Sequence, residues 1–133
     1  FGRIGKLLSS RLHGLGARVT ASARKPGDLA WIRAYGWQAL ETGGLDGRLE
    51  SFGAVFNTVP SLILDAALLS QLSPGCLCVD LASVPGIDLA AAESLGLPHV
   101  WARSLPGRLV PRTAAAVIRD AVYYILEERG EPA

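Results

Sequence analysis

The sequence has no methionine and only two cysteines, and those two are not arranged for metal binding. Cys76 and Cys78 lie two residues apart in an apolar segment, so on a strand their side chains would share one face. A Cys-x-Cys pair without a second cluster of Cys or His is a poor zinc site. We therefore expect two buried thiols, no metal site and a reducing, cytoplasmic location.

The sequence also lacks an apolar run that would cross a membrane, although half of its 133 residues are hydrophobic. Its most apolar region, 54–92, is interrupted by polar residues and prolines, among them Asn57, Pro60, Asp65 and Asp80. No window reaches the roughly 18 apolar residues of a spanning helix, and no basic segment precedes an apolar run as in a signal peptide. The composition instead predicts one folded domain without a membrane partner.

Acidic residues are nearly absent from the first third of the chain. Residues 1–36 carry seven basic side chains and one acidic one, whereas residues 37–133 carry six basic and eleven acidic ones. A basic first third suits either nucleic acid or a compact polyanion such as a dinucleotide. Because this segment lacks interleaved aromatic residues that would stack on bases, we expect no nucleic-acid partner.

Helical and strand-like patterns alternate along the chain, which is typical of β-α-β units and a parallel sheet. The expected helices are residues 4–15, 28–35, 65–72, 89–95 and 113–128, capped in two cases by Asp28 and Thr113, with one or two helical turns at 45–52. The expected strands are residues 18–23, 37–40, 54–57, 77–80 and 99–102. The pattern predicts an α/β fold with a Rossmann-like, doubly wound parallel sheet. Because a helix comes first, we expect the first strand of that sheet to lie upstream of Phe1.

The opening Phe1-Gly2-Arg3-Ile4-Gly5 carries most of a dinucleotide-binding fingerprint. With one glycine supplied before Phe1 it reads Gly-x-Gly-x-x-Gly, in which the second glycine lets the backbone approach a pyrophosphate and the third lets the helix lie close to the sheet. The phosphates of such a ligand bind free N–H groups at the positive end of the helix. The motif therefore predicts nucleotide binding at the start of the first helix.

No acidic residue stands at the end of the first predicted strand, about 20 residues further on. An NAD site usually has Asp or Glu there to bind the ribose hydroxyls. This chain has Ser22-Ala23-Arg24-Lys25 and no acid before Asp28. A carboxylate would repel a 2′-phosphate, whereas a hydroxyl and a guanidinium would bind it. We therefore predict NADP(H) rather than NAD(H) as the cofactor.

Polar loops rich in Pro and Gly follow three later strands, at residues 57–61, 80–86 and 104–107. Ligands in open α/β sheets bind beyond the carboxyl ends of the strands, so these loops predict a cleft for the nicotinamide. Neither His13 nor His99 is placed for proton transfer there, and no catalytic residue is assigned. The pattern leaves open whether Asp80 is a structural acceptor or a site residue.

Five segments together resemble one known family: residues 1–5, 22–24, 57–64, 80–86 and 104–114. They are similar to the carboxyl-terminal nucleotide-binding domain of the A-type subunit of dipicolinate synthase. The resemblance covers nearly the whole chain. It implies that residues 1–133 are a partial NAD(P)-binding Rossmann domain, from which the first strand and the amino-terminal domain of that family are absent.

The resemblance also implies an activity and a set of site residues. The activity would be NADP-dependent oxidation of a dihydrodipicolinate-type ring, from the lysine route, to dipicolinate in sporulating bacteria. The flavoprotein-like B-type subunit of dipicolinate synthase would be a partner, the protein would be a homo-oligomer, and this fragment alone would be inactive. The pyrophosphate, the 2′-phosphate and the nicotinamide would be held, in that order, by three groups of residues: Gly2, Arg3, Ile4 and Gly5; Ser22, Arg24 and Lys25; Thr58, Val59, Pro60, Ala82 and Ser83.

Two alternatives remain open at this stage. The fingerprint of D-2-hydroxyacid dehydrogenases also reads Gly-x-Gly-Arg-Ile-Gly, but those enzymes need an Arg soon after the fifth strand and a later His–acid pair. Here no Arg follows Asp80 before Arg103, and no His follows His99. A non-catalytic module that senses NAD(P) is the second alternative, because cofactor residues are present and catalytic ones are not.

Overall fold

The structure, a computed structural model, describes residues 1–105, 108 and 111–128. The chain divides into two units, residues 1–101 and 102–133, and each is described by itself. The first unit contains every strand of the described residues and carries most of the predicted site. The second contains the long helix α6 (Pro111–Glu128).

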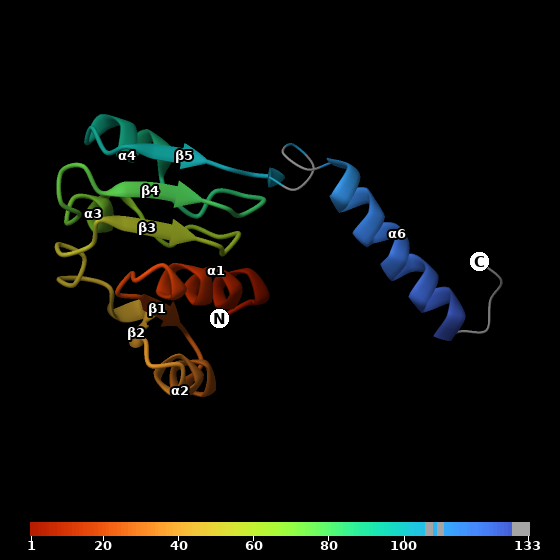
Figure 1. Cartoon of the computed structure of the whole chain (residues 1–133). Coiled ribbons are helices and arrows are strands. Elements are labelled where there is room, and N and C mark those ends of the chain that lie inside the picture. The colour runs from red at the N-terminus through yellow and green to blue at the C-terminus, as the bar shows by residue number, and fades with distance from the viewer. Residues whose placement is uncertain (106–107, 109–110, 129–133) are drawn as a thin grey trace. The chain divides into compact units, whose positions relative to one another are not determined.

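Helices and strands alternate through the first unit, as the sequence pattern predicts (Figure 1). Its strands are β1 (Thr20–Ala23), β2 (Gln38–Glu41), β3 (Ala54–Asn57), β4 (Leu77–Asp80) and β5 (His99–Trp101). Its helices are α1 (Arg3–Gly14), α2 (Pro26–Ala34), α3 (Ala66–Leu69) and α4 (Leu89–Ser94), with a single 3-10 turn, η1 (Thr42–Gly44).

All the strand pairs are parallel, and they form two sheets. β1 pairs with β2, and β3, β4 and β5 pair in that order. The α/β class and the parallel pairing predicted from the sequence are confirmed. Figure 1 shows α1 between the two sheets. The His13 ring on α1 lies 6.3 Å from the ring of Trp37, which immediately precedes β2, so α1 lies beside the two-stranded sheet.

The core consists of two buried clusters, one for each sheet. The larger one packs leucines from α3 and the neighbouring segments around β4, where Cys78 is completely buried. The smaller one packs Ile32 of α2 and Trp37 against the alanines of β1. Both cysteines are free thiols in the larger cluster, so the expected burial of Cys76 and Cys78 is confirmed. Loss of solvation raises the pKa of both thiols, to about 11 for Cys78.

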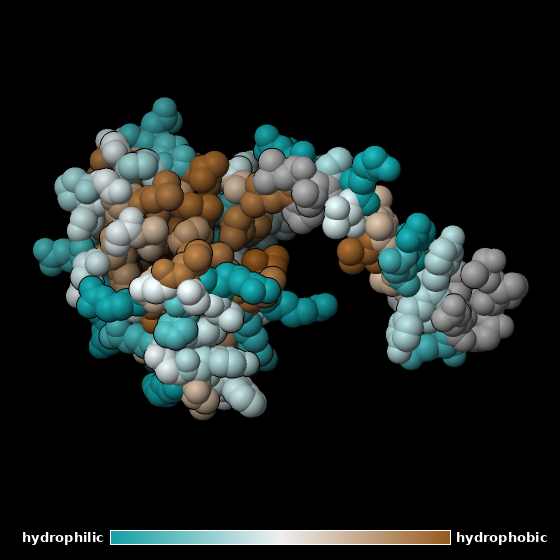
Figure 2. All heavy atoms as spheres, in the orientation of Figure 1, coloured by the Kyte–Doolittle hydropathy of each residue, from teal (hydrophilic) through white to brown (hydrophobic). Residues whose placement is uncertain are grey.

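The three-stranded sheet is covered unequally on its two faces. Phe56, Val79 and Val100 stand opposite one another in the register, so they share one face. Phe56 and Val100 on that face are exposed, as is Leu77, whereas Asn57 and Cys78 on the other face are buried. Figure 2 shows the resulting broad apolar area on the first unit. Helix α1 contributes Ile4 and Leu7 to the exposed apolar surface, since both are more than half exposed.

Three sequence predictions about helices are wrong. Residues 45–52 form non-helical turns instead of the predicted one or two turns of helix, because Gly47 adopts a φ of 69°, in the left-handed region. Asp28 does not cap α2, whose N-cap is Lys25; it lies in the first turn instead, where a carboxylate complements the helix dipole. Thr113 lies inside α6, which begins at Pro111, and proline is favoured at a first helical position because its missing N–H needs no partner.

Helix α6 is amphipathic in sequence, and Val117, Ile118, Val122 and Tyr124 along it are exposed. The Tyr124 hydroxyl donates a hydrogen bond of 2.8 Å to the Glu128 carboxylate one turn later. Within the described part of the chain, no helix is both long and apolar enough to cross a membrane. Half of the predicted loop 104–107, residues 106–107, lies outside the described residues.

Candidate functional site

The start of α1 is open toward solvent. Gly2 is the N-cap, in an extended conformation with φ −80° and ψ 177°, and no side chain caps the helix. A Cβ placed on Gly2 would meet no atom within 4 Å. Neither the backbone conformation nor a protein contact therefore requires glycine at this position. The first turn of a helix presents N–H groups that have no acceptor within the helix, so this end is suited to an anion.

The predicted pyrophosphate residues lie next to the loop that follows β3. A Cβ on Gly5 would be 3.6 Å from the hydroxyl oxygen of Thr58 and 3.7 Å from the ring of Phe1. Arg3 and Ile4 in the same turn are exposed. The structure thus brings Gly5 and Thr58 together, although the two residues are more than fifty positions apart in the sequence.

Exposed polar side chains mark the end of β1 on the same side of the unit. Ser22, Arg24 and Lys25 are exposed, and in the described part of the chain neither the Arg24 nor the Lys25 side chain has a hydrogen-bond or ion-pair partner. The nitrogen of Phe1 donates to the carboxylate of Asp28 at 3.2 Å, which ties the beginning of α2 to the beginning of α1. The unpaired cations therefore stand near the open helix end.

The loop after β3 is shaped by the buried side chain of Asn57. Its carboxamide accepts a hydrogen bond from the Val59 N–H at 3.1 Å and donates one to the Val59 carbonyl at 2.9 Å. Thr58 is half-buried, while Val59 and Pro60 are exposed. The turn therefore directs apolar side chains of Val59 and Pro60 outward at the carboxyl end of β3.

The loop after β4 is shaped by Asp80, which is completely buried. Its carboxylate accepts hydrogen bonds from Asn57 at the end of β3 and from backbone N–H groups of its own loop, including that of Ala82 at 2.9 Å. Ala82 is also buried, and its carbonyl accepts the indole N–H of Trp101 at 2.9 Å, so it offers little side-chain surface to a ligand. Ser83 is exposed. Of the two alternatives left open by the sequence, the hydrogen bonds favour Asp80 as a structural acceptor.

Gly86, in the loop after β4, is a further residue at the carboxyl edge of the sheet, and the sequence did not identify it as a site residue. A Cβ at position 86 would lie 2.6 Å from the carbonyl oxygens of Ser61 and Val59, so only glycine fits between the two loops. The Pro85-Gly86 pair was the available signal, but a turn accounts for such a pair equally well.

The histidines lie away from these loops. His99 begins β5, at the amino edge of the sheet, and its Nδ1 lies 2.8 Å from the Leu97 carbonyl oxygen. His13 is near the far end of α1 from Gly2. His99 is thus at the amino end of its strand and His13 at the end of α1 away from the predicted pyrophosphate residues, and no catalytic acid or base is assigned.

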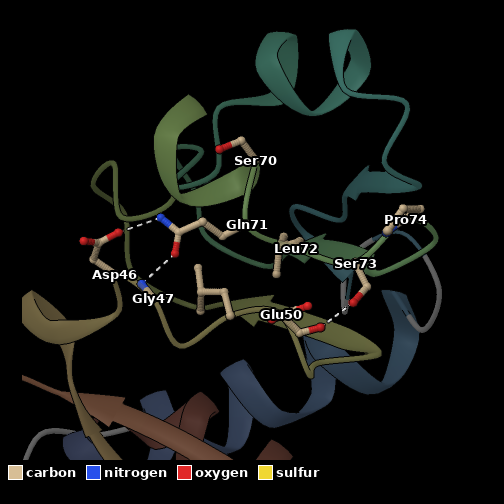
Figure 3. A pocket seen from close by; sticks show the side chains of 9 residues that line it. Asp46, Gly47, Glu50, Ser70, Gln71, Leu72, Ser73 and Pro74 are labelled. Atoms are coloured by element: carbon tan, nitrogen blue, oxygen red, sulfur yellow. Dashed lines mark hydrogen bonds between the residues drawn. The ribbon is translucent and has the colours of Figure 1, made fainter.

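A separate pocket of about 480 Å³ lies at the amino ends of β3 and β4 (Figure 3). It is lined by residues of the segments before those two strands: 46, 47, 49 and 50, and 70–74. Gln71 spans it, donating to Asp46 at 2.7 Å and accepting from the Gly47 N–H at 2.7 Å, and the Ser73 hydroxyl donates to the Glu50 carbonyl. These bonds join the two segments, and the pocket is at the opposite edge from the predicted cofactor residues.

Comparison with known proteins gives one consistent relationship. No family model matches the chain. The chain is 34% identical over 128 residues to the A-type subunit of dipicolinate synthase of Bacillus subtilis (strain 168), which is 96% of this chain and 43% of that protein. The crystal structure of dipicolinate synthase, A chain, from Bacillus subtilis matches with a TM-score of 0.90 at 34% identity, over 96% of this chain and 43% of that one. The corresponding crystal structure from Bacillus halodurans matches with a TM-score of 0.89 at 30% identity, over 95% and 44%. The resemblance inferred from the sequence is confirmed, and the chain spans less than half the length of these relatives.

Proposed function

We propose that the chain, which matches the A-type dipicolinate synthase of Bacillus subtilis over 96% of its length, is the cofactor domain of an NADP-dependent dehydrogenase. The reaction is oxidation of a dihydrodipicolinate-type ring to dipicolinate during sporulation. The observation that carries the proposal is the pairing of an open helix start at Gly2 with two unpaired cations, Arg24 and Lys25, at the end of β1.

The first turn of α1 binds the pyrophosphate. Its N–H groups lie at the positive end of the helix dipole, and the missing side chain at Gly2 lets phosphate oxygens approach the backbone. Gly5 keeps the same turn close to Thr58. Arg3 is exposed beside this turn and adds a positive charge for the phosphates.

Ser22, Arg24 and Lys25 bind the 2′-phosphate. The guanidinium of Arg24 offers a two-pronged set of donors, and the Ser22 hydroxyl and Lys25 ammonium complete the site. No carboxylate stands at the end of β1 to bind free ribose hydroxyls, which supports NADP(H) over NAD(H).

The loops after β3 and β4 flank the nicotinamide through Thr58, Val59, Pro60, Ala82 and Ser83. Bound nicotinamide supplies the hydride acceptor, and the protein orients the ring and excludes water from one side of it. The exposed apolar surfaces of Val59 and Pro60 suit that task, and Ala82 acts through its backbone since its side chain is buried.

The domain, partner, assembly and cellular setting are proposed from the similarity to the Bacillus proteins. We propose that residues 1–133 form part of a Rossmann domain that a further strand completes between β1 and β3, since those strands belong to separate sheets. A B-type dipicolinate synthase partner, a homo-oligomeric assembly and a cytoplasmic setting belong to the same proposal. The whole protein, rather than this domain, is the catalytic unit.

The test compares nucleotides and variants on the full-length natural protein. Isothermal titration with NADPH and NADH is expected to show tighter binding of NADPH, and Arg24→Ala is expected to remove most of that preference. Arg18→Ala, an exposed arginine before β1, is the matched control and is expected to change neither affinity. Equal affinities in the natural protein, or a preference that survives Arg24→Ala, would reject the NADP assignment.

A turnover assay separates the enzyme from the sensing module. The dehydrogenase oxidises a freshly generated dihydrodipicolinate-type substrate and reduces NADP stoichiometrically, with the B-type partner added in a parallel reaction. A protein that binds NADPH tightly and yields no dipicolinate under either condition is the non-catalytic sensor.

A further inference from the structure

Asp80 sits at the end of β4 with every acceptor position of its carboxylate in use. One oxygen accepts from the Asn57 side-chain amide at 3.0 Å and from the Ala82 N–H at 2.9 Å. The other accepts from the N–H groups of Gly86 at 2.7 Å and Ile87 at 2.9 Å. All four partners are N–H donors, and the side chain is completely buried, so Asp80 does not reach a ligand itself.

The same hydrogen bonds extend into the loop after β3. Asn57, which donates to Asp80, also holds both the N–H and the carbonyl of Val59. Gly86, whose N–H is held by Asp80, accepts from the N–H groups of Ile63 at 2.8 Å and Leu64 at 3.0 Å. Asp80 is therefore the point where the loops after β3 and β4 are joined.

We infer that Asp80 is a positioning residue, which gives these two loops the shape that receives the nicotinamide half of the cofactor. This inference rests on the proposed function, because that function assigns Thr58 to Pro60 and Ser83 to the nicotinamide. A buried carboxylate that orders two loops before binding lowers the entropy lost when a ligand binds them. Asp80 is not the general base, since it has no free acceptor and no exposed surface.

The two halves of the cofactor depend on Asp80 differently. The adenosine half is assigned to the start of α1 and to Arg24 and Lys25, and none of these residues makes a hydrogen bond with Asp80 or with its four donors. Adenosine 2′,5′-bisphosphate carries only that half. Loss of the Asp80 carboxylate is therefore expected to weaken the binding of NADPH and to leave the affinity for the bisphosphate unchanged.

The experiment is isothermal titration of the full-length protein and its Asp80→Asn variant with NADPH and with adenosine 2′,5′-bisphosphate. In the variant an amide NH₂ replaces one acceptor oxygen and faces N–H donors. NADPH is expected to bind about tenfold more weakly, and the bisphosphate within about twofold of the natural value. The matched control is Asp65→Asn, in which an exposed N-cap carboxylate of α3 becomes an amide that caps equally well. It is expected to change neither affinity.

A second variant and a second readout keep the inference open to refutation. Asn57→Ala is the variant to measure if Asp80→Asn does not fold. It leaves three N–H donors on the Asp80 carboxylate and is expected to weaken NADPH binding while sparing the bisphosphate. Faster amide hydrogen exchange at Gly86 and Ile87 in either variant supports the positioning role. Unchanged NADPH affinity, or equal loss of both ligands in both variants, overturns it. If the natural protein binds neither ligand, the proposed function fails, and the exchange rates alone decide whether Asp80 orders the loops.

Discussion

Gly86 faces Asn57 so closely that a methyl group at position 86 would overlap the Asn57 carboxamide. The backbone carbonyls of Val59 and Ser61 stand on the other sides of the same space, each 2.6 Å from where a Cβ would be. Backbone atoms cannot move aside as the end of a long side chain can. The loops after β3 and β4 therefore meet at a position that admits no side chain.

Gly86→Ala is expected to destabilise the protein by about 1–3 kcal/mol, the usual cost of adding volume to a filled site. Urea unfolding, followed by tryptophan fluorescence, measures the free energy of unfolding. Gly27→Ala is the matched control, because Gly27 lies in α2 and a Cβ there meets nothing within 4 Å. A Gly86→Ala protein as stable as the Gly27→Ala protein would contradict the packing described here.

Gln71→Ala is expected to loosen the amino edge of the sheet without affecting nucleotide binding. The change removes three side-chain hydrogen bonds: one to Asp46 and one from the Gly47 N–H, both of 2.7 Å, and one of 3.3 Å to the Ala67 carbonyl. Because the groups are exposed, the expected loss of stability is about 1 kcal/mol, measured by urea unfolding. NADPH affinity, measured by titration, is expected to stay the same, since the pocket lies at the opposite edge from the predicted cofactor residues. A large loss of NADPH affinity in Gln71→Ala would show instead that the amino edge of the sheet influences the predicted cofactor residues at the carboxyl edge.

Much of the fold follows from local patterns in the sequence. The segments 54–57 and 77–80 are apolar and end in Asn57 and Asp80, and they match β3 and β4 at every residue. β4 has two completely buried side chains, Cys78 and Asp80, whereas Asn57 is the one buried residue of β3. The prediction failed at 45–52, where Leu45 and Leu49 are four residues apart, as on a helix, but are buried by turns around Gly47. Spacing alone does not distinguish these two ways of burying a pair of leucines.

The candidate site was less predictable than the fold. The sequence left the role of Asp80 open, because two of its partners, Gly86 and Ile87, come six and seven residues later and are brought back only by the folded loop. The contact between Gly5 and Thr58 likewise depends on how α1 lies beside the three-stranded sheet. Long-range relationships of this kind have no periodic signature in the sequence.

The thiols of Cys76 and Cys78 are expected to be unreactive in the folded protein. Burial disfavours the thiolate and raises the pKa of both groups, to about 11 for Cys78 against an ordinary value of 9.0. Ellman's reagent at pH 8 is expected to label neither thiol in the folded protein and both in guanidinium chloride. Rapid labelling without denaturant would contradict the burial.

The same pKa shift predicts a loss of stability in alkali. The folded state holds the Cys78 proton more tightly than the unfolded state, so the stabilising contribution is complete below pH 9 and declines as the pH rises toward 11. The free energy of unfolding between pH 8 and pH 10 is expected to fall less steeply in Cys78→Ala than in the natural protein. Identical slopes would show that Cys78 titrates normally in the fold.

Gly2→Ala tests whether glycine at this position serves nucleotide binding rather than folding. The fold does not require glycine there: the backbone is extended, and a Cβ would meet no protein atom within 4 Å. Alanine is a poorer N-cap than glycine, so the expected loss of stability is about 1 kcal/mol. A methyl group at this position would nonetheless stand where the pyrophosphate approaches the backbone, and NADPH affinity is expected to fall about tenfold, or about 1.4 kcal/mol. Gly14→Ala, at the other end of α1 with equally open surroundings, is the control and is expected to leave the affinity unchanged. Equal affinities for the two variants would mean that the start of α1 does not bind the pyrophosphate.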